Sequence, residues 1–356
     1  MTDPLAYSPD IETVDPGEPA LFDRIAAVMR AGGKVARDGE GPGGRISHVS
    51  TIAALKGEVV VLSDLAPELA QGIFVPGRRY PVVARMSHLP GEDLDQRGVS
   101  SHRGLSIKLF GVPGALLGRH TGDTQDFVLE NAPAFNVASP AAFLLAISTV
   151  EAAAPLPQGA KVAVSAAARG LNRALGAVGV ASANLDILGH PRRHPLSEAF
   201  HSQAPLRWGA YVAKLAAFPG DGQPDLPFDA DAPDALRRAA VAHIAGHGAT
   251  FTLAAQLWTD ASAMPIEDAS IAWPETLSPH RPVAILRFPP QDAAGPARIA
   301  GIDALSFSPA HAIEAHRPLG GIMRSRLALY TALSAERRRA AGLPLTEPSG
   351  PDAVAD

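Results

Sequence analysis

A series of short β-type runs constrains the fold of this chain more than any other feature of its sequence. Each run is rich in β-branched and other apolar residues, and glycine, proline or polar residues separate the runs. In chain order they span residues 46–52, 58–63, 80–87, 105–110, 126–129, 211–218, 251–258 and 283–288. Eight strands are enough to close a barrel whose interior is filled by side chains. We therefore expect an α+β fold with an antiparallel eight-stranded β-barrel core and flanking α-helices.

Three stretches with a helical period flank these runs, at residues 18–37, 140–179 and 319–339. The last residues of the chain are rich in Pro, Ser, Gly and Asp, a composition typical of disorder. We expect an N-terminal arm over residues 1–17, a single domain over 18–340 and a disordered tail over 341–356.

The charge balance and hydropathy of the chain exclude several function classes. The 356 residues carry a formal net charge of −5 and contain no basic run of the kind that binds nucleic acid. No apolar run is long enough to span a bilayer, and the first residues lack the charged and apolar regions of a signal peptide. These features predict a cytoplasmic protein with no membrane span and no nucleic-acid partner.

Arg326 and Tyr330 lie four residues apart in the last helical stretch. At that spacing two side chains share a helix face, so the guanidinium can lie beside the phenol oxygen and favour its anionic form. Tyrosinate is one of the axial ligands of haem iron, and a chain with no cysteine cannot offer a thiolate instead. The pair alone is more typical of a helix face that covers a core.

Two upstream motifs add to this pair, Arg-Ile-Ser-His at residues 45–48 and Ala-Arg-Met-Ser at residues 84–87. Together with the C-terminal helix they resemble the haem-catalase superfamily. In that family an Arg-x-x-His motif carries the distal histidine. A later Arg-x-Ser motif supplies a propionate-binding arginine and a serine that orients the histidine.

The resemblance continues in order along the chain, over about residues 40 to 335. Residues 103–110 are similar to the family's Arg-Gly-Phe-Ala-Val-Lys-Phe strand, and residues 126–135 are similar to its Asn-Asn-Thr-Pro segment. Residues 307–309 and 326–330 resemble its Phe-x-Pro and Arg-Leu-x-x-Tyr motifs. The chain is most similar to the short catalase-related peroxidase branch, which lacks the terminal extensions of large catalases.

This resemblance implies a haem b cofactor held against the barrel. It assigns iron ligation to Tyr330 with Arg326 beside it, distal catalysis to His48, Ser87 and Asn131, propionate binding to Arg45, Arg85 and Arg103, and stacking on a pyrrole to Phe143. A neutral imidazole near its pKa is well suited to move a proton from one peroxide oxygen to the other.

Several positions depart from the family pattern, among them residues 49–51, which are Val-Ser-Thr in place of the usual Ala-Lys-Gly. In an ungapped match Glu130 takes the place of the distal asparagine of large catalases, and Asn131 takes the next place. A shift of one residue turns a strand side chain to the opposite face, so Asn131 needs a local bulge to reach the haem side. We expect Asn131 there, because an ionised Glu130 above a haem would repel peroxide anion and cost desolvation energy. Another departure is Ser47, which replaces the valine of large catalases.

These observations favour a haem-dependent peroxidase that splits the O–O bond of hydrogen peroxide or organic hydroperoxides, with an organic electron donor as a possible partner. One alternative is a lyase, dehydratase or isomerase of lipid hydroperoxides. A hydroxyl residue at the position of Ser47 accompanies that chemistry in the family, and the channel would be shaped by Ser47 together with Ile46, Met86, Phe135 and Leu144. Another alternative is a haem-binding protein without catalysis. The resemblance also implies a homodimer or larger homo-oligomer.

Overall fold

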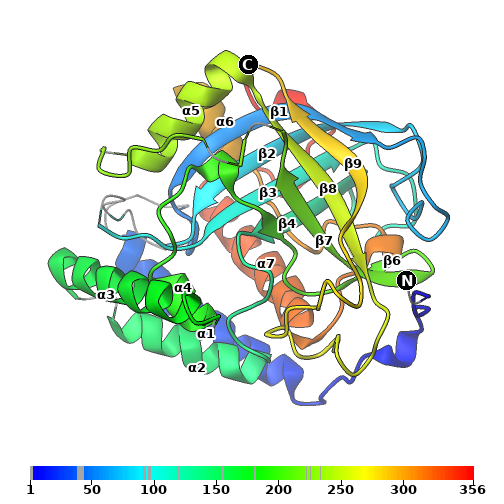
Figure 1. The fold of residues 1–356 in the computed structure, drawn as a ribbon, viewed down its shortest axis with the longest axis horizontal. Coiled ribbons are helices and arrows are strands. Elements are labelled where there is room, and N and C mark those ends of the chain that lie inside the picture. The colour runs from blue at the N-terminus through cyan, green and yellow to red at the C-terminus, as the bar shows by residue number, and fades with distance from the viewer. Residues whose placement is uncertain are drawn as a thin grey trace.

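The computed structural model shows a closed β-barrel with helices packed around it (Figure 1). It describes residues 3–37, 44–90, 94, 98–118, 120–153, 156–179, 182–221, 223–224, 226–232 and 234–356. The strands are β1 (Thr51–Val61), β2 (Arg79–His88), β3 (Arg103–Phe110), β4 (Thr124–Glu130), β5 (Phe200–His201), β6 (Leu206–Trp208), β7 (Tyr211–Pro219), β8 (Ala249–Leu257) and β9 (Arg281–Phe288). The α-helices are α1 (Glu18–Arg37), α2 (Pro140–Ala153), α3 (Gln158–Gly176), α4 (Ala183–Leu188), α5 (Ala235–His247), α6 (Pro296–Ala304) and α7 (Gly321–Ala340).

All neighbouring strands are antiparallel, in the order β5-β4-β3-β2-β1-β9-β8-β7-β6. The sheet closes because β5 also pairs with β7. β6 pairs with a different part of β7, so β5 and β6 together fill one position in the ring. The barrel therefore has eight strand positions, and the predicted α+β barrel fold is confirmed.

Two details of the strands differ from the prediction. Residues 46–52 and 58–63 were expected as separate strands, but one continuous strand, β1, covers residues 51–61. Gly57 lies inside it, where a Cβ would come within 2.0 Å of the Arg287 carbonyl oxygen on β9, so this glycine permits close strand approach and not a turn. β5 and β6 are too short to show a periodic pattern, and the sequence analysis missed them.

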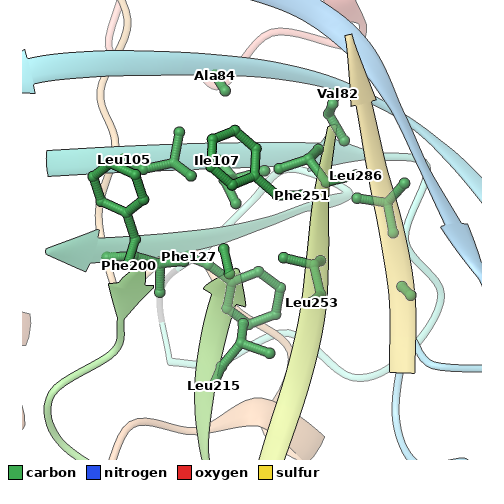
Figure 2. Packing of buried hydrophobic residues seen from close by; sticks show 14 of the residues in the cluster. Val82, Ala84, Leu105, Ile107, Phe127, Phe200, Leu215, Phe251, Leu253 and Leu286 are labelled. Carbon is green, nitrogen blue, oxygen red and sulfur yellow. The ribbon is translucent and has the colours of Figure 1, made fainter. Parts of the chain in front are cut away.

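Alternate residues of the strands fill the barrel interior (Figure 2). Buried side chains there include Ala84 and Met86 of β2, Leu105 and Ile107 of β3, and Phe127 of β4. Because side chains alternate across a strand, the intervening residues of these strands point out of the barrel. That outer face of β2, β3 and β4 carries the candidate site.

Helices α1, α2 and α7 pack against one another beside the barrel (Figure 1). Their shared core contains Ile25 of α1, Ile147 of α2 and Leu329 of α7. The predicted helix over residues 18–37 matches α1, and α2, α3 and α7 lie in the other two stretches expected to be helical. Within the described ranges, no helix is both long enough and apolar enough to cross a membrane.

The C-terminal tail is packed on the barrel, in contrast to the predicted disorder. Val354 is fully buried in a cluster on the outer face of β1 and β2. Glu347 contacts the ammonium of Lys108 on β3, at 2.5 Å, and the guanidinium of Arg338 on α7, at 3.2 Å. Both basic side chains are buried and need a carboxylate partner, which the composition of the tail does not reveal. The division into an arm over 1–17 and a domain over 18–340 stays a prediction.

Candidate functional site

His48 lies just before β1, with its ring against the outer face of the barrel. Its backbone has φ of 54°, in the left-handed region that few non-glycine residues adopt. Its Nδ1 atom lies 3.0 Å from the Ser87 hydroxyl of β2. The Arg85 guanidinium donates to the carbonyl oxygen of His48 at 2.8 Å. The structure thus brings together His48, Ser87 and Arg85, as the sequence analysis expected.

Gly104 of β3 provides the space that the imidazole occupies. A Cβ at this position would lie 2.9 Å from His48 Cε1 and 3.0 Å from Ser87 Oγ. Ser87, Gly104 and Glu130 pair in one row across β2, β3 and β4, so their positions face the same side of the sheet. The imidazole therefore lies over the middle of a row that has a hydroxyl on one side and a carboxylate on the other.

The expectation that Asn131 lies beside His48 is wrong. The β3–β4 register runs without a bulge from Phe110 to Gly104, so the residue after Glu130 turns to the opposite face. There the Asn131 side chain accepts from the Arg103 backbone N–H at 2.7 Å and donates to Glu198. The ungapped match holds, and Glu130 takes the place on the His48 side.

Three guanidinium groups gather at Asp303 and Leu305, near His48. Arg85 binds the Asp303 carboxylate at 2.8 Å, and Arg45 lies 3.9 Å from the same oxygen. Arg337 of α7 donates to the carbonyl oxygens of Asp303, at 2.9 Å, and Leu305, at 2.8 Å. Arg45 donates to the same Leu305 carbonyl oxygen at 2.9 Å. We call Arg45, Arg85 and Arg337 the arginine cluster. With Asp303 it leaves two positive charges in excess.

Arg103 does not belong to this cluster. It shares the face of Leu105 and Ile107, which line the barrel interior, whereas Arg85 points outward. Its side chain is 1% exposed and binds the Glu198 carboxylate at 2.8 Å. The prediction that Arg103 acts with Arg45 and Arg85 is therefore wrong, because the alternation of β3 sends its side chain inward.

Arg326 and Tyr330 share a face of α7, as their spacing predicted. The guanidinium lies 3.4 Å from the phenol oxygen and 5.3 Å from the centre of the ring. Tyr330 is close enough to Arg45 to affect the pKa of that guanidinium, and Arg326 is close enough to affect the pKa of His48. Arg326 and Tyr330 on α7 are thus close enough to His48 and the arginine cluster for their charges to interact.

Phe143 of α2 lies between two apolar clusters next to this helix. Its ring is 5.7 Å from that of Phe135, edge to face, and both pack with Met323 of α7. The sulfur of Met323 lies 3.6 Å from Arg326 Nη1. Phe143 is therefore near the Arg326 side of the site, and its role as a stacking platform stays a prediction.

Burial lowers the pKa of His48 to about 4. The carboxylate of Glu130 acts in the opposite direction and raises this pKa, while the charges of Arg85, Arg326 and Arg45 lower it further. The imidazole is consequently neutral at neutral pH. In the tautomer in which Nδ1–H donates to the hydroxyl oxygen of Ser87, Nε2 is the nitrogen that can accept a proton.

The residues of the lipid-hydroperoxide alternative are spread over different parts of the structure, with Ile46 and Ser47 directly before His48. Ser47 is exposed, and Met86 is fully buried in the barrel interior. Phe135 and Leu144 pack in the helical clusters beside α7. The described positions of these four residues do not form one lining.

Sequence analysis missed Arg337 and the partners of Glu130. Arg337 lies seven residues after Tyr330, two turns along the same helix face, and this spacing was the available signal. Glu130 is bound by His102, whose Nδ1 lies 2.8 Å from its Oε1 atom. No local pattern indicates that contact.

Comparison with solved structures identifies catalases as structural neighbours. Catalase A from Saccharomyces cerevisiae superposes with a TM-score of 0.63 at 17% identity, covering 99% of this chain and 70% of that one. A fungal catalase gives 0.64 at 17% identity, over 99% and 68%. A bacterial catalase gives 0.62 at 17% identity, over 97% and 66%. This chain thus has the catalase fold and spans about two thirds of their length. No protein-family model matches it, and no curated protein is a significant match.

Proposed function

We propose that this protein binds haem b and acts as a haem-dependent peroxidase of the catalase-related type, on hydrogen peroxide or organic hydroperoxides. One observation carries the proposal. The neutral imidazole of His48, against the outer face of the barrel, lies close enough to Arg326 of the Arg326–Tyr330 pair on α7 for their charges to interact. The catalase fold supports it. A cytoplasmic location and a homodimer or larger homo-oligomer are part of the same proposal.

The charge of the arginine cluster fits this cofactor. Asp303 supplies one carboxylate, beside Arg85 and Arg45, against three guanidinium groups, and the two excess charges match the two propionates of haem b. The Nε atom of Arg45 is buried and has no hydrogen-bond partner among the described residues. A buried donor without an acceptor is costly, and a propionate oxygen would satisfy it. Arg45, Arg85 and Arg337 are therefore the residues that would hold the propionates.

Tyr330 would bind the iron, and Arg326 would donate to its oxygen and stabilise the phenolate. Bound in this way, the iron porphyrin would supply the redox chemistry of O–O cleavage. Ser87 holds the His48 ring through Nδ1, so Nε2 is free to take a proton from a hydroperoxide and give it back to the leaving oxygen. The low pKa of His48, about 4, keeps that nitrogen unprotonated before the substrate arrives.

The proposal is tested by optical spectroscopy of the protein purified with haem and after addition of each peroxide. We expect a Soret band that Tyr330→Phe shifts or removes, while the control Tyr211→Phe keeps it. His48→Ala should keep the haem but slow the spectral change on peroxide addition by about a hundredfold, the scale of a lost general acid–base. His247→Ala, at an exposed position, serves as its control. A chain that takes up no haem, or a Tyr330→Phe spectrum equal to the wild type, would refute the proposal.

A further inference from the structure

Glu130 stands on the His48 side of the site, where a neutral amide was expected. We propose that Glu130 recognises the O–H group of the substrate. Its free carboxylate oxygen accepts a hydrogen bond from a neutral hydroperoxide or water, and its charge excludes small anions. This inference rests on the proposed function and adds a specificity-determining residue to it.

The register of the strands places Glu130 within reach of whatever lies at His48. Gly104 separates Glu130 from Ser87 in one row, and the imidazole lies over Gly104. Adjacent strands are about 4.8 Å apart, so a glutamate side chain on the next strand extends alongside that ring. The influence of Glu130 on the pKa of His48 agrees with this placement.

A chain of hydrogen-bonded partners holds the carboxylate on the side away from His48. His102, which is 2% exposed, binds Glu130 Oε1 through Nδ1 and Asp186 Oδ2 through Nε2, at 2.8 and 2.9 Å. Asp186 is held in turn by Asn172, which donates at 2.9 Å, and by His190 at 2.9 Å. Within the described part of the chain, the second oxygen of Glu130, Oε2, has no hydrogen-bond partner. The Oε1 atom of Glu130 is thus held by His102, and its Oε2 atom can accept a hydrogen bond from a ligand.

The same partners keep Glu130 ionised. Burial opposes the charged form of Glu130, but the hydrogen bond and the charge of His102 outweigh it, so the pKa of Glu130 is lowered. Burial also works against the charge of His102, yet its two carboxylate partners raise its pKa to about 9. An imidazolium between two carboxylates carries one net negative charge, so this group stays anionic at neutral pH.

That negative charge lies on the His48 side of the proposed site. The excess charge of the arginine cluster would be matched by the two propionates, and the net positive charge of a ferric porphyrin by the Tyr330 phenolate, which leaves Arg326 on α7 as the positive charge that balances it. A carboxylate beside the distal position then opposes an anionic ligand and favours a neutral one with an O–H or N–H group. A purely structural Glu130, which only anchors His102, would not discriminate between such ligands.

The first test compares ligand binding in the haem-loaded wild type, Glu130→Gln and the control Glu58→Gln. Glu58 is a carboxylate on β1 that pairs with the exposed Arg79. Azide, an anion at pH 7, and imidazole, largely neutral at pH 8, are titrated through the Soret band. We expect Glu130→Gln to bind azide about tenfold more tightly, with imidazole affinity changed less than twofold and Glu58→Gln unchanged. Equal azide affinity in the wild type and Glu130→Gln would overturn the inference.

The second test needs no haem. Histidine-labelled apo protein is titrated by NMR in the wild type, Glu130→Gln and Asp186→Asn. Loss of the Glu130 charge should lower the pKa values of both His48 and His102, whereas Asp186→Asn should lower mainly that of His102. An unchanged His48 titration in a folded Glu130→Gln protein would show that this carboxylate does not face His48. Failure of the wild type to take up haem counts against the proposed function alone. The NMR result then decides whether Glu130 faces His48.

Discussion

The imidazole of His48 lies directly over Gly104, so close that a Cβ at Gly104 would come within 2.9 Å of its Cε1 atom. The position of a proposed catalytic side chain therefore depends on the absence of another side chain on the neighbouring strand. Gly104 has no positive φ, and its requirement for glycine is one of space only.

Gly104→Ala should displace the imidazole and leave the barrel folded. We expect the reaction of the haem-loaded protein with hydrogen peroxide to slow by about a hundredfold, because a displacement near 1 Å is enough for a loss of that size. Overpacking should cost about 1 to 3 kcal/mol of unfolding free energy. Stopped-flow absorbance and urea unfolding measure the two effects. Gly170→Ala in α3, where a Cβ meets nothing within 4 Å, is the control, and equal peroxide kinetics in both variants would contradict the packing argument.

Arg337→Gln should weaken haem binding. Arg337 completes the arginine cluster from α7, and its loss removes one charged donor to the proposed propionates, worth about tenfold or more in affinity. Haem transfer to apomyoglobin measures the loss. Arg339→Gln, in the same helical turn but exposed, should behave as the wild type. If the two variants lose haem equally fast, Arg337 does not bind a propionate.

Much of the fold followed from patterns within short segments. The apolar period over residues 18–37 predicted α1, and the β-type runs predicted six of the strands individually. The pattern failed at Gly57, because a glycine that allows close strand approach looks the same as one that ends a strand. It also failed for β5, whose two residues are defined by pairing with β4 and β7 and by no pattern of their own.

The candidate site was predictable where residue spacing sets geometry and not where tertiary contacts do. The i,i+4 spacing of Arg326 and Tyr330 predicted their contact. Strand alternation could also have separated Arg103 from Arg85, since Leu105 and Ile107 mark the inward face of β3. His102, just before β3, binds Glu130 at the end of β4, and this contact offsets the cost of burying the Glu130 charge. The two residues are far apart in the sequence, so the desolvation argument against Glu130 did not include it.

Stability should fall as the pH is lowered from about 6.5 towards 4. Burial lowers the pKa of His194 and His316 to about 4 and that of His88 to about 3, whereas an unfolded histidine titrates near 6.5. In this window the unfolded chain binds protons that the folded protein does not. Each of these histidines then lowers the free energy of unfolding by up to about 1.4 kcal/mol for each unit by which the pH falls. His102, with its raised pKa, is protonated in both states here and adds no slope.

Urea unfolding at pH 7.0, 6.0 and 5.0 measures this dependence. His316→Gln should flatten it, although the variant is less stable at pH 7, because it loses the bond that His316 Nε2 accepts from the Ile73 backbone N–H. The exposed His247→Gln should leave the slope unchanged. A midpoint that stays constant from pH 6.5 to pH 5 would show that these histidines are protonated in the fold.

Glu347→Gln should destabilise the whole protein, although the residue lies only nine positions from the C-terminus. Its carboxylate is 4% exposed and contacts the fully buried Lys108 at 2.5 Å and Arg338 at 3.2 Å. Lys108 keeps Asp126 as a partner at 2.7 Å, so the buried charge loses part of its compensation and not all of it. We expect a loss of about 3 kcal/mol of unfolding free energy, at the lower end for a broken buried pair. Asp352→Asn, in the same tail but with a fully exposed side chain 3.8 Å from Lys56, should leave the unfolding temperature unchanged. Thermal unfolding of the two variants tests this prediction. If the tail were disordered, the two variants would have equal unfolding temperatures.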